Sequence, residues 1–115
     1  MISVEALSKR FTQRRGKQTE VIAAVSDVHF TAQDARITGL LGPNGAGKTT
    51  SLRIVAGLID ADAGRVQVDG LDIVHSRRQA LGRLGILSDA RGLYPRLSAR
   101  ENILYYARLH GMSDS

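Results

Sequence analysis

The stretch LLGPNGAGKTTSLRIVAGL, residues 40–58, places glycines 42, 45 and 47, a proline and a lysine between two apolar segments. Residues 42–49 of it satisfy the pattern G-x-x-x-x-G-K-[ST], in which a glycine-rich loop wraps around phosphate groups. Glycine permits positive φ angles and a close approach of the backbone to a ligand, so successive N–H groups can point at phosphate oxygens. The stretch therefore predicts a strand, a phosphate-binding loop and a helix, in that order.

The residues of this loop have separate chemical roles. Lys48 supplies a positive charge for the β- and γ-phosphates of a nucleoside triphosphate, and the Thr49 hydroxyl is a hard oxygen ligand for the accompanying Mg²⁺. The helix that follows adds its first-turn N–H groups and the positive end of its dipole. A glycine turn that matches by chance is the competing interpretation, which the apolar segments on both sides disfavour. The predicted phosphate-binding residues are Gly42, Pro43, Asn44, Gly45, Ala46, Gly47, Lys48, Thr49 and Thr50.

Strands and helices intermix on both sides of the loop. Alternation and β-branched residues predict strands at 4–11, 20–30, 35–41, 65–69, 71–74 and 84–89. The strands at 35–41 and 84–89 are apolar enough to be buried on both faces. The polar segment 9–18 predicts the loop of a β-hairpin. The fold class is therefore α/β.

Three helices are predicted from spacing and capping. Leu52, Val55, Ala56 and Ile59 fall on one face of a helix that runs from about residue 47 to 57, and a short helix is expected within 76–84. Ser98 is a good N-cap, and the glutamate three residues later completes a capping box. That last helix is expected to end at Gly111.

The composition fits one ordinary domain. The 115 residues are 43% hydrophobic and include no cysteine, which excludes disulfides and thiolate metal sites and fits a reducing compartment. No apolar run approaches the roughly 18 residues that a bilayer span needs, and the first residues lack the apolar core of a signal peptide. We therefore expect a soluble intracellular protein. The net charge of +5 suits a polyanionic partner such as nucleic acid, acidic lipid or a polyphosphate.

With these motifs in place, the sequence resembles a known family over essentially its whole length. Residues 40–58, followed by DADAGRVQVDG at 60–70, resemble the N-terminal half of the ATP-binding cassette of ABC transporters. Residues 88–111, SDARGLYPRLSARENILYYARLHG, further resemble the exporter type that includes sodium-extruding and drug-resistance cassettes. The resemblance implies a P-loop NTPase core with an antiparallel β segment in residues 1–93 and the start of a helical subdomain in 94–115.

The resemblance also implies a function and partners. Such a subunit binds ATP and Mg²⁺, pairs head to tail with a second cassette subunit and powers export by a separate transmembrane permease. It lies in the cytoplasm, peripheral on the inner face of the cell membrane. Residues 94–108 match the region near the surface that docks on the membrane domain. Nucleic acid is not expected as a partner, because Phe11 is the only aromatic residue within the basic cluster around the first loop, which is little for base stacking beyond a nucleotide.

Two further site residues follow from the resemblance alone. Phe11 matches the aromatic residue that stacks on adenine, and a core phenylalanine at a strand end is the alternative. Asp89 matches the position of a glutamine that senses Mg²⁺ and the γ-phosphate. An aspartate is one methylene shorter and charged, so a plain turn aspartate is the alternative to a metal-related role.

The family's remaining motifs are not found in the sequence. Three motifs belong to the C-terminal half of a cassette: the signature L-S-G-G-Q, the Mg-site aspartate with the catalytic glutamate, and the switch histidine. This chain is expected to be truncated before that half. We therefore expect no catalytic residue here and no ATP hydrolysis by this chain alone. Two alternatives stay open: a binding-only nucleotide module without turnover, and a non-transport ABC protein that acts on nucleic acid or ribosomes. Unpaired sheet edges also predict poor solubility or self-association.

Three groups of charged or polar residues are assigned structural roles. The basic cluster is expected to be a solvated hairpin loop, the histidines show no metal-ligand spacing, and the aspartates flank glycines as turn and strand-end residues. These groups are Lys9, Arg10, Arg14, Arg15 and Lys17; His29, His75 and His110; and Asp60, Asp62 and Asp69.

Overall fold

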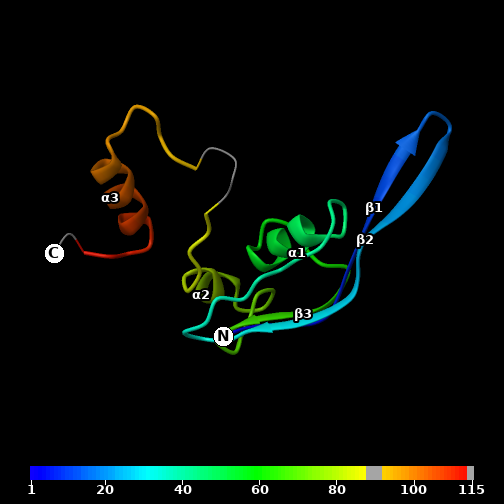
Figure 1. Cartoon of the computed structure of the whole chain (residues 1–115), viewed down its shortest axis with the longest axis horizontal. Helices are drawn as coiled ribbons and strands as arrows, with labels where there is room; N and C mark the ends of the chain where they lie inside the picture. The colour runs from blue at the N-terminus through cyan, green and yellow to red at the C-terminus, as the bar shows by residue number, and fades with distance from the viewer. Residues whose placement is uncertain (88–91, 114–115) are drawn as a thin grey trace. The chain divides into compact units, whose positions relative to one another are not determined.

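The structure is a computed structural model that describes residues 1–87 and 92–113 and divides into two compact units, residues 1–84 and 85–115 (Figure 1). In the described residues, no helix combines the length and the apolar composition needed to cross a bilayer. The first unit contains β1 (Ile2–Arg15), β2 (Gln18–Ala32), α1 (Lys48–Val55), β3 (Ala63–Val68), β4 (Leu71–Asp72) and α2 (Arg77–Leu81), and the second contains α3 (Ala99–Leu109).

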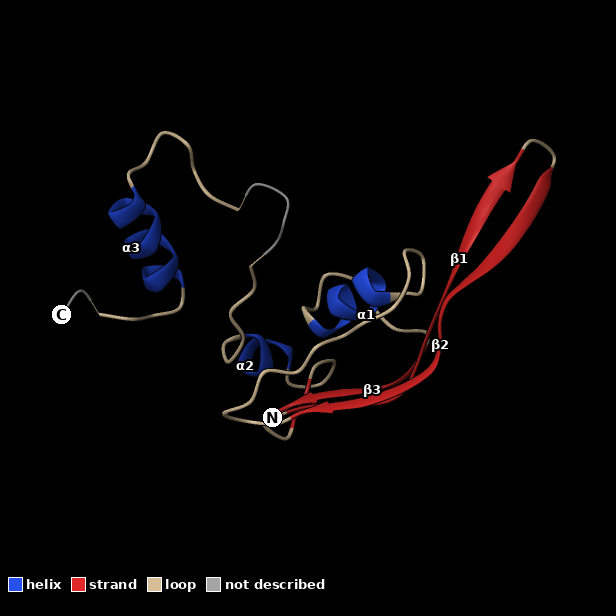
Figure 2. Ribbon diagram, viewed as in Figure 1, coloured by secondary structure: helices blue, strands red, loops and turns tan. Residues whose placement is uncertain are grey.

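An antiparallel sheet with the strand order β2-β1-β3-β4 forms the base of the first unit. β1 and β2 continue past the end of β3 as a two-stranded ribbon (Figure 2). The prediction that residues 9–18 form a loop is wrong, because Arg15 pairs with Gln18 and only residues 16–17 form the turn. A ribbon that is exposed on both faces accepts polar side chains, since its backbone hydrogen bonds do not depend on them.

The core lies between α1 and the sheet. Its buried apolar residues are Val4, Leu7, Val25, Ile54, Val55, Val66 and Ile73. On α1, the buried residues are Ser51, Ile54 and Val55, whereas Leu52 is 54% exposed. The predicted face is therefore wrong at Leu52, whereas Val55 is buried and Ile59 packs against the core, as expected. Because α1 ends at Val55 and the chain turns at the next residues, Ile59 reaches the core from beyond the helix.

Two predicted strands are absent from the described residues. Residues 37–41 have no regular secondary structure, with Ile37 and Leu41 almost fully exposed, and residues 84–87 form no strand either. The last part of the segment 84–89 lies outside the described residues. A strand buried on both faces needs neighbours in its sheet. Within residues 1–87 and 92–113 no strand pairs with either segment, which explains why the apolar pattern was misleading.

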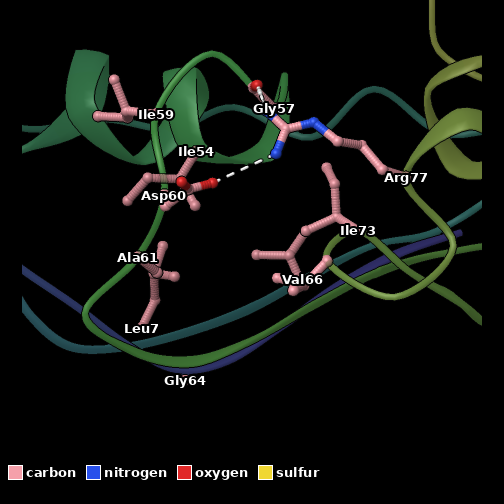
Figure 3. Close-up of a pocket in the computed structure, with 11 residues that line it drawn as sticks. Leu7, Ile54, Gly57, Ile59, Asp60, Ala61, Gly64, Val66, Ile73 and Arg77 are labelled. Carbon is pink, nitrogen blue, oxygen red and sulfur yellow. Dashed lines mark hydrogen bonds and ion pairs between the residues drawn. The ribbon is translucent and has the colours of Figure 1, made fainter.

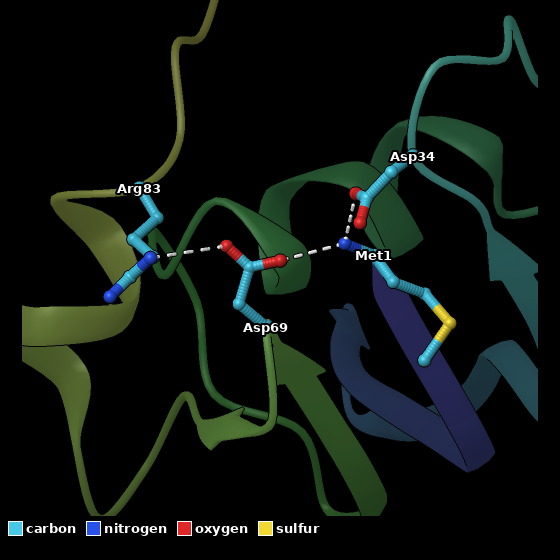
Figure 4. A network of polar contacts seen from close by, with 4 residues as sticks. All are labelled: Met1, Asp34, Asp69 and Arg83. Carbon is cyan, nitrogen blue, oxygen red and sulfur yellow. Dashed lines mark hydrogen bonds and ion pairs between the residues drawn. The ribbon is translucent and has the colours of Figure 1, made fainter.

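A polar network lies where β1 begins (Figure 4). The Met1 amine contacts the carboxylates of Asp34 and Asp69, the latter at 2.7 Å, and Arg83 lies 3.6 Å from the second oxygen of Asp69. The hydrogen bond from the amine lowers the pKa of Asp69 below its usual value. Asp69 thus connects the first residue of the chain with the segment after α2, in keeping with the strand-end role predicted for it.

The second unit is built around α3. Ser98 caps this helix, and the predicted capping box is confirmed: Glu101 N donates to Ser98 Oγ at 3.3 Å and Ser98 N donates to Glu101 Oε2 at 2.7 Å. The helix ends at Leu109, just before Gly111, which has a φ of 73°. The loop before α3 is tied to it by the buried Asn102.

The capping box predicts a pH dependence. The hydrogen bond from Ser98 N lowers the pKa of Glu101 below its ordinary 4.5. Because the folded pKa is the lower one, the stabilisation is present above 4.5 and is lost as the pH falls through the folded pKa. An NMR titration of the Ser98 amide should therefore give a midpoint below 4.5. A midpoint at or above 4.5 would contradict the box, and Glu101→Gln should abolish the titration.

Asn102 predicts a local loss of stability. Its Oδ1 accepts from Tyr94 N at 2.8 Å, and its Nδ2 donates to the carbonyl oxygens of Tyr94, Leu97 and Ser98. Asn102→Ala should cost about 1–3 kcal/mol of local stability, because it leaves buried polar groups unpaired. Hydrogen exchange at the Tyr94 amide should become correspondingly faster. Asn102→Asp keeps an acceptor for this amide and should retain more protection; equal losses in both variants would argue against the assigned contact.

Candidate functional site

A groove of about 430 Å³ separates the β1–β2 ribbon from the glycine-rich loop and the start of α1. One wall comes from the ribbon and the other from the loop and the first turn of the helix. The residues that line it are Phe11, Ile22, Ala23, Ala24, Asn44, Gly45, Gly47, Lys48, Thr49 and Thr50. The groove therefore brings a strand residue near the N-terminus together with residues more than 30 positions further along the chain.

The loop curls because two of its glycines adopt positive φ angles, 84° at Gly45 and 89° at Gly47. Ala46 N donates to Pro43 O at 3.1 Å and closes a turn within the loop. At Gly47 the backbone lies so close to β2 that a β-carbon would be 2.3 Å from the carbonyl oxygen of Ala24. The loop is therefore seated directly on the strand, at the floor of the groove.

The helix α1 begins at the groove. Its first residue is Lys48, and the first intrahelical bond of the N-cap runs from Ser51 N to Gly47 O at 2.8 Å. The first N–H groups of a helix have no intrahelical acceptor, and Gly47 has no side chain that could accept from them. No acidic residue lies in this first turn. The arrangement favours an anion at this end of the helix.

Lys48 and the two threonines after it line the groove. The Lys48 ammonium donates to the carbonyl oxygen of Gly42, so it is held back against its own loop. Lys48 and Thr50 are half-buried, and Thr49 is exposed. The groove wall thus carries one positive charge and two hydroxyl groups.

Phe11 forms the opposite end of the lining. It pairs with Ile22 across the ribbon, so both side chains lie on the same face, and its side chain is 40% exposed. The alternative of a buried core phenylalanine is therefore wrong. The Lys9 ammonium lies 5.5 Å from the centroid of the Phe11 ring.

A second cavity lies beneath the end of α1 (Figure 3). It has a volume of only about 20 Å³ and is lined largely by core side chains, including Leu7, Ile54 and Val66. Arg77 reaches across its rim to Asp60, at 3.3 Å, and to the carbonyl of Gly57. A space of this size holds at most a water molecule, so the cavity is a gap in the packing rather than a ligand site.

The structure brings together seven of the predicted site residues in the groove lining. Gly42, Pro43 and Ala46 belong to the same loop but do not line the groove, and Asp89 lies outside the described residues. Three lining residues were not predicted: Ile22, Ala23 and Ala24. Cross-strand pairing with Phe11 would have identified Ile22, but only once the turn at 16–17 was known.

The oxygen atoms available as metal ligands show whether a magnesium ion would fit in the groove. Within residues 1–87 and 92–113 no three side chains of His, Cys, Asp or Glu gather as a metal site. Among the described residues that line the groove, Thr49 and Thr50 have hydroxyl groups and none has a carboxylate. Mg²⁺ commonly keeps several waters and takes its other ligands from one or two protein oxygens and substrate phosphates. The residues present therefore fit an ion that arrives with a phosphate ligand.

Comparison with known proteins gives consistent results. The family model described as ABC transporter matches residues 25–115. The ABC transporter ATP-binding protein NatA of Bacillus subtilis is 40% identical over 114 residues, which cover 98% of this chain and 45% of that protein. The linearmycin resistance ATP-binding protein LnrL of the same species is 33% identical over 113 residues, 98% of this chain and 34% of LnrL. The chain thus spans less than half the length of these relatives.

Solved structures share the fold. The dimeric structure of MJ0796, a bacterial ABC transporter cassette, superposes with a TM-score of 0.78 at 23% identity, over 100% of this chain and 50% of that chain. The structure of an ATP-binding subunit of an ABC transporter gives a TM-score of 0.77 at 23% identity, over 98% of this chain and 44% of that chain. The α/β P-loop core with an antiparallel segment, covering about half a cassette, is therefore confirmed.

Proposed function

The chain belongs to the ABC transporter family, as part of an ATP-binding subunit, and we propose that its groove binds Mg-ATP. The observation that carries the proposal is the groove itself, in which an exposed aromatic ring and a glycine-rich phosphate loop line one space of about 430 Å³. An aromatic ring suits a base, and a helix N-terminus with a lysine suits a triphosphate. Only a ligand that has both a base and a triphosphate would contact both walls of the groove.

The phosphates are assigned to residues 42–50. An ammonium group has three donors, and in Lys48 one of them is used by the carbonyl of Gly42, which leaves two for phosphate oxygens. The N–H groups at the start of α1 and in the curled loop would add donors that need no side chain. Gly42, Pro43 and Ala46 would then contribute through the backbone shape of the loop.

The adenine is assigned to the Phe11 end of the groove. Stacking of a base on an aromatic side chain contributes about 1–3 kcal/mol in comparable sites. Ile22, which pairs with Phe11, extends the apolar wall on that face of the ribbon. This assignment accounts for an exposed aromatic side chain on the ribbon.

The magnesium ion is assigned to the hydroxyl of Thr49, together with phosphate oxygens and water. Bound there, Mg²⁺ would neutralise charge on the β- and γ-phosphates. A metal-related role of Asp89 remains a hypothesis from the family resemblance.

For the protein of which this chain represents a cassette half, we propose ATP hydrolysis that powers export through a membrane permease. Two cassettes would pair head to tail on the cytoplasmic face of the membrane. MJ0796 is known as a dimer, and NatA and LnrL are named as ATP-binding proteins, LnrL for resistance to linearmycin. These relatives support the assignment.

Calorimetric titration of the chain with Mg-ATP tests the proposed binding. We expect saturable binding with one site per chain, and competition by Mg-tripolyphosphate, which carries the phosphates without the base. A folded sample that shows no heat and no competition at millimolar ligand would refute the nucleotide site. Circular dichroism on the same sample establishes that the chain is folded.

A further inference from the structure

Asp62, just before β3, supports the irregular part of β1 that precedes Phe11. Its backbone N–H donates to Ser8 O at 2.9 Å, and its Oδ2 accepts from the backbone N–H of Arg10 at 2.7 Å. The β1–β3 pairing ends with Ser8 opposite Ala63, and the β1–β2 register shifts on both sides of Lys9. The Asp62 carboxylate thus takes the place of a strand partner at this point.

The same carboxylate also binds Lys9. Lys9 Nζ donates to Asp62 Oδ1 at 3.4 Å and lies 5.5 Å from the centroid of the Phe11 ring. Only 18% of the Lys9 side chain is exposed, so the ammonium is confined between carboxylate and ring. A cation at this distance is attracted by the negative face of an aromatic ring. The hydrogen bond from Arg10 N, supplemented by Lys9, lowers the pKa of Asp62 below its ordinary value.

We propose that Asp62 and Lys9 are positioning residues that hold the Phe11 ring at the groove wall for stacking on the base of a bound nucleotide. The inference rests on the proposed function of the groove. Phe11 lines the groove, whereas Lys9 and Asp62 do not appear among the described residues that line it. They act on the ligand through the ring alone, and a ring fixed in advance loses less conformational freedom when the base binds.

Two ligands distinguish the binding contribution of the base from that of the phosphates. Mg-ATP uses the whole groove, and Mg-tripolyphosphate uses only the phosphate loop. Lys9→Met keeps most of the apolar stem and removes the charge, and Asp62→Ala removes both contacts of the carboxylate. Each should weaken Mg-ATP about three- to tenfold, a part of the full stacking contribution, and leave Mg-tripolyphosphate unchanged within about twofold.

Three further variants control for a merely structural role. Asp60→Ala removes an exposed carboxylate two positions away that pairs with Arg77 at 3.3 Å, and should leave the ratio of the two affinities unchanged. Lys9→Arg keeps a cation at this position, so the ratio of the Mg-ATP affinity to the Mg-tripolyphosphate affinity should stay close to that of the unsubstituted chain. In a Phe11→Ala background, Asp62→Ala should not change the ratio further, because the two residues act as one unit.

A readout without nucleotide completes the test. The ε-methylene protons of Lys9 should show an upfield NMR shift from the Phe11 ring, which Phe11→Leu and Asp62→Ala both abolish. If this shift is present but neither ligand binds, the proposed function fails and the positioning role fails with it. If both ligands bind and the variants leave their ratio unchanged, or weaken the two in parallel, the positioning role alone is refuted.

Discussion

Lys48→Ala should weaken Mg-ATP binding by at least about 100-fold, since hydrogen bonds to charged groups contribute roughly 1.5–3 kcal/mol each and two Lys48 donors are assigned to phosphate. Lys48 is the only cation among the described residues that line the groove. Its loss also frees the carbonyl of Gly42, which it contacts in the structure. Titration of the variant with Mg-ATP measures the effect.

Arg53→Ala is the matched control for this substitution. Arg53 is a cation on the same helix, exposed and outside the groove lining. If the Lys48 effect is local, removal of Arg53 should change the affinity by no more than about twofold at physiological salt, where the screening length is about 8 Å. Equal losses in both variants would mean that the net charge of the surface, rather than Lys48, attracts the nucleotide.

The features predicted correctly from the sequence are local ones. The curl of the glycine-rich loop depends on the glycines at 45 and 47, whose positive φ angles a short pattern can specify. The capping box at Ser98 and Glu101 spans three residues and needs no other part of the chain. In each case the residues that carry the signal also make the contacts, so the sequence pattern is sufficient.

The features missed or wrongly predicted depend on distant parts of the chain. Ile22 reaches the groove only because the ribbon turns at residues 16–17 and sets its register with Phe11. Asp62 was predicted to serve the turn before β3, and its pairing with Lys9 appears only when β1 and β3 lie side by side. The apolar segment 35–41 predicted a buried strand, but apolarity alone does not supply the neighbouring strands that such a strand needs.

The close approach between the phosphate loop and β2 leads to the strongest prediction about the fold of the site. A β-carbon at Gly47 would lie 2.3 Å from the carbonyl oxygen of Ala24, and the φ of 89° is unfavourable for any other residue. Gly47→Ala should therefore push the loop off the strand, lower the free energy of unfolding by about 2–5 kcal/mol and abolish Mg-ATP binding. Urea unfolding and nucleotide titration measure the two effects.

Gly45→Ala separates backbone strain from the collision. Gly45 has nearly the same φ, 84°, but a β-carbon there would meet nothing within 4 Å. This variant should lower the free energy of unfolding only by the conformational contribution, about 1–2 kcal/mol. The difference between the two variants then measures how firmly the loop is seated on Ala24. Equal losses of stability would mean that the loop moves away from β2 without cost, and the floor of the groove would then not be a fixed surface for phosphate.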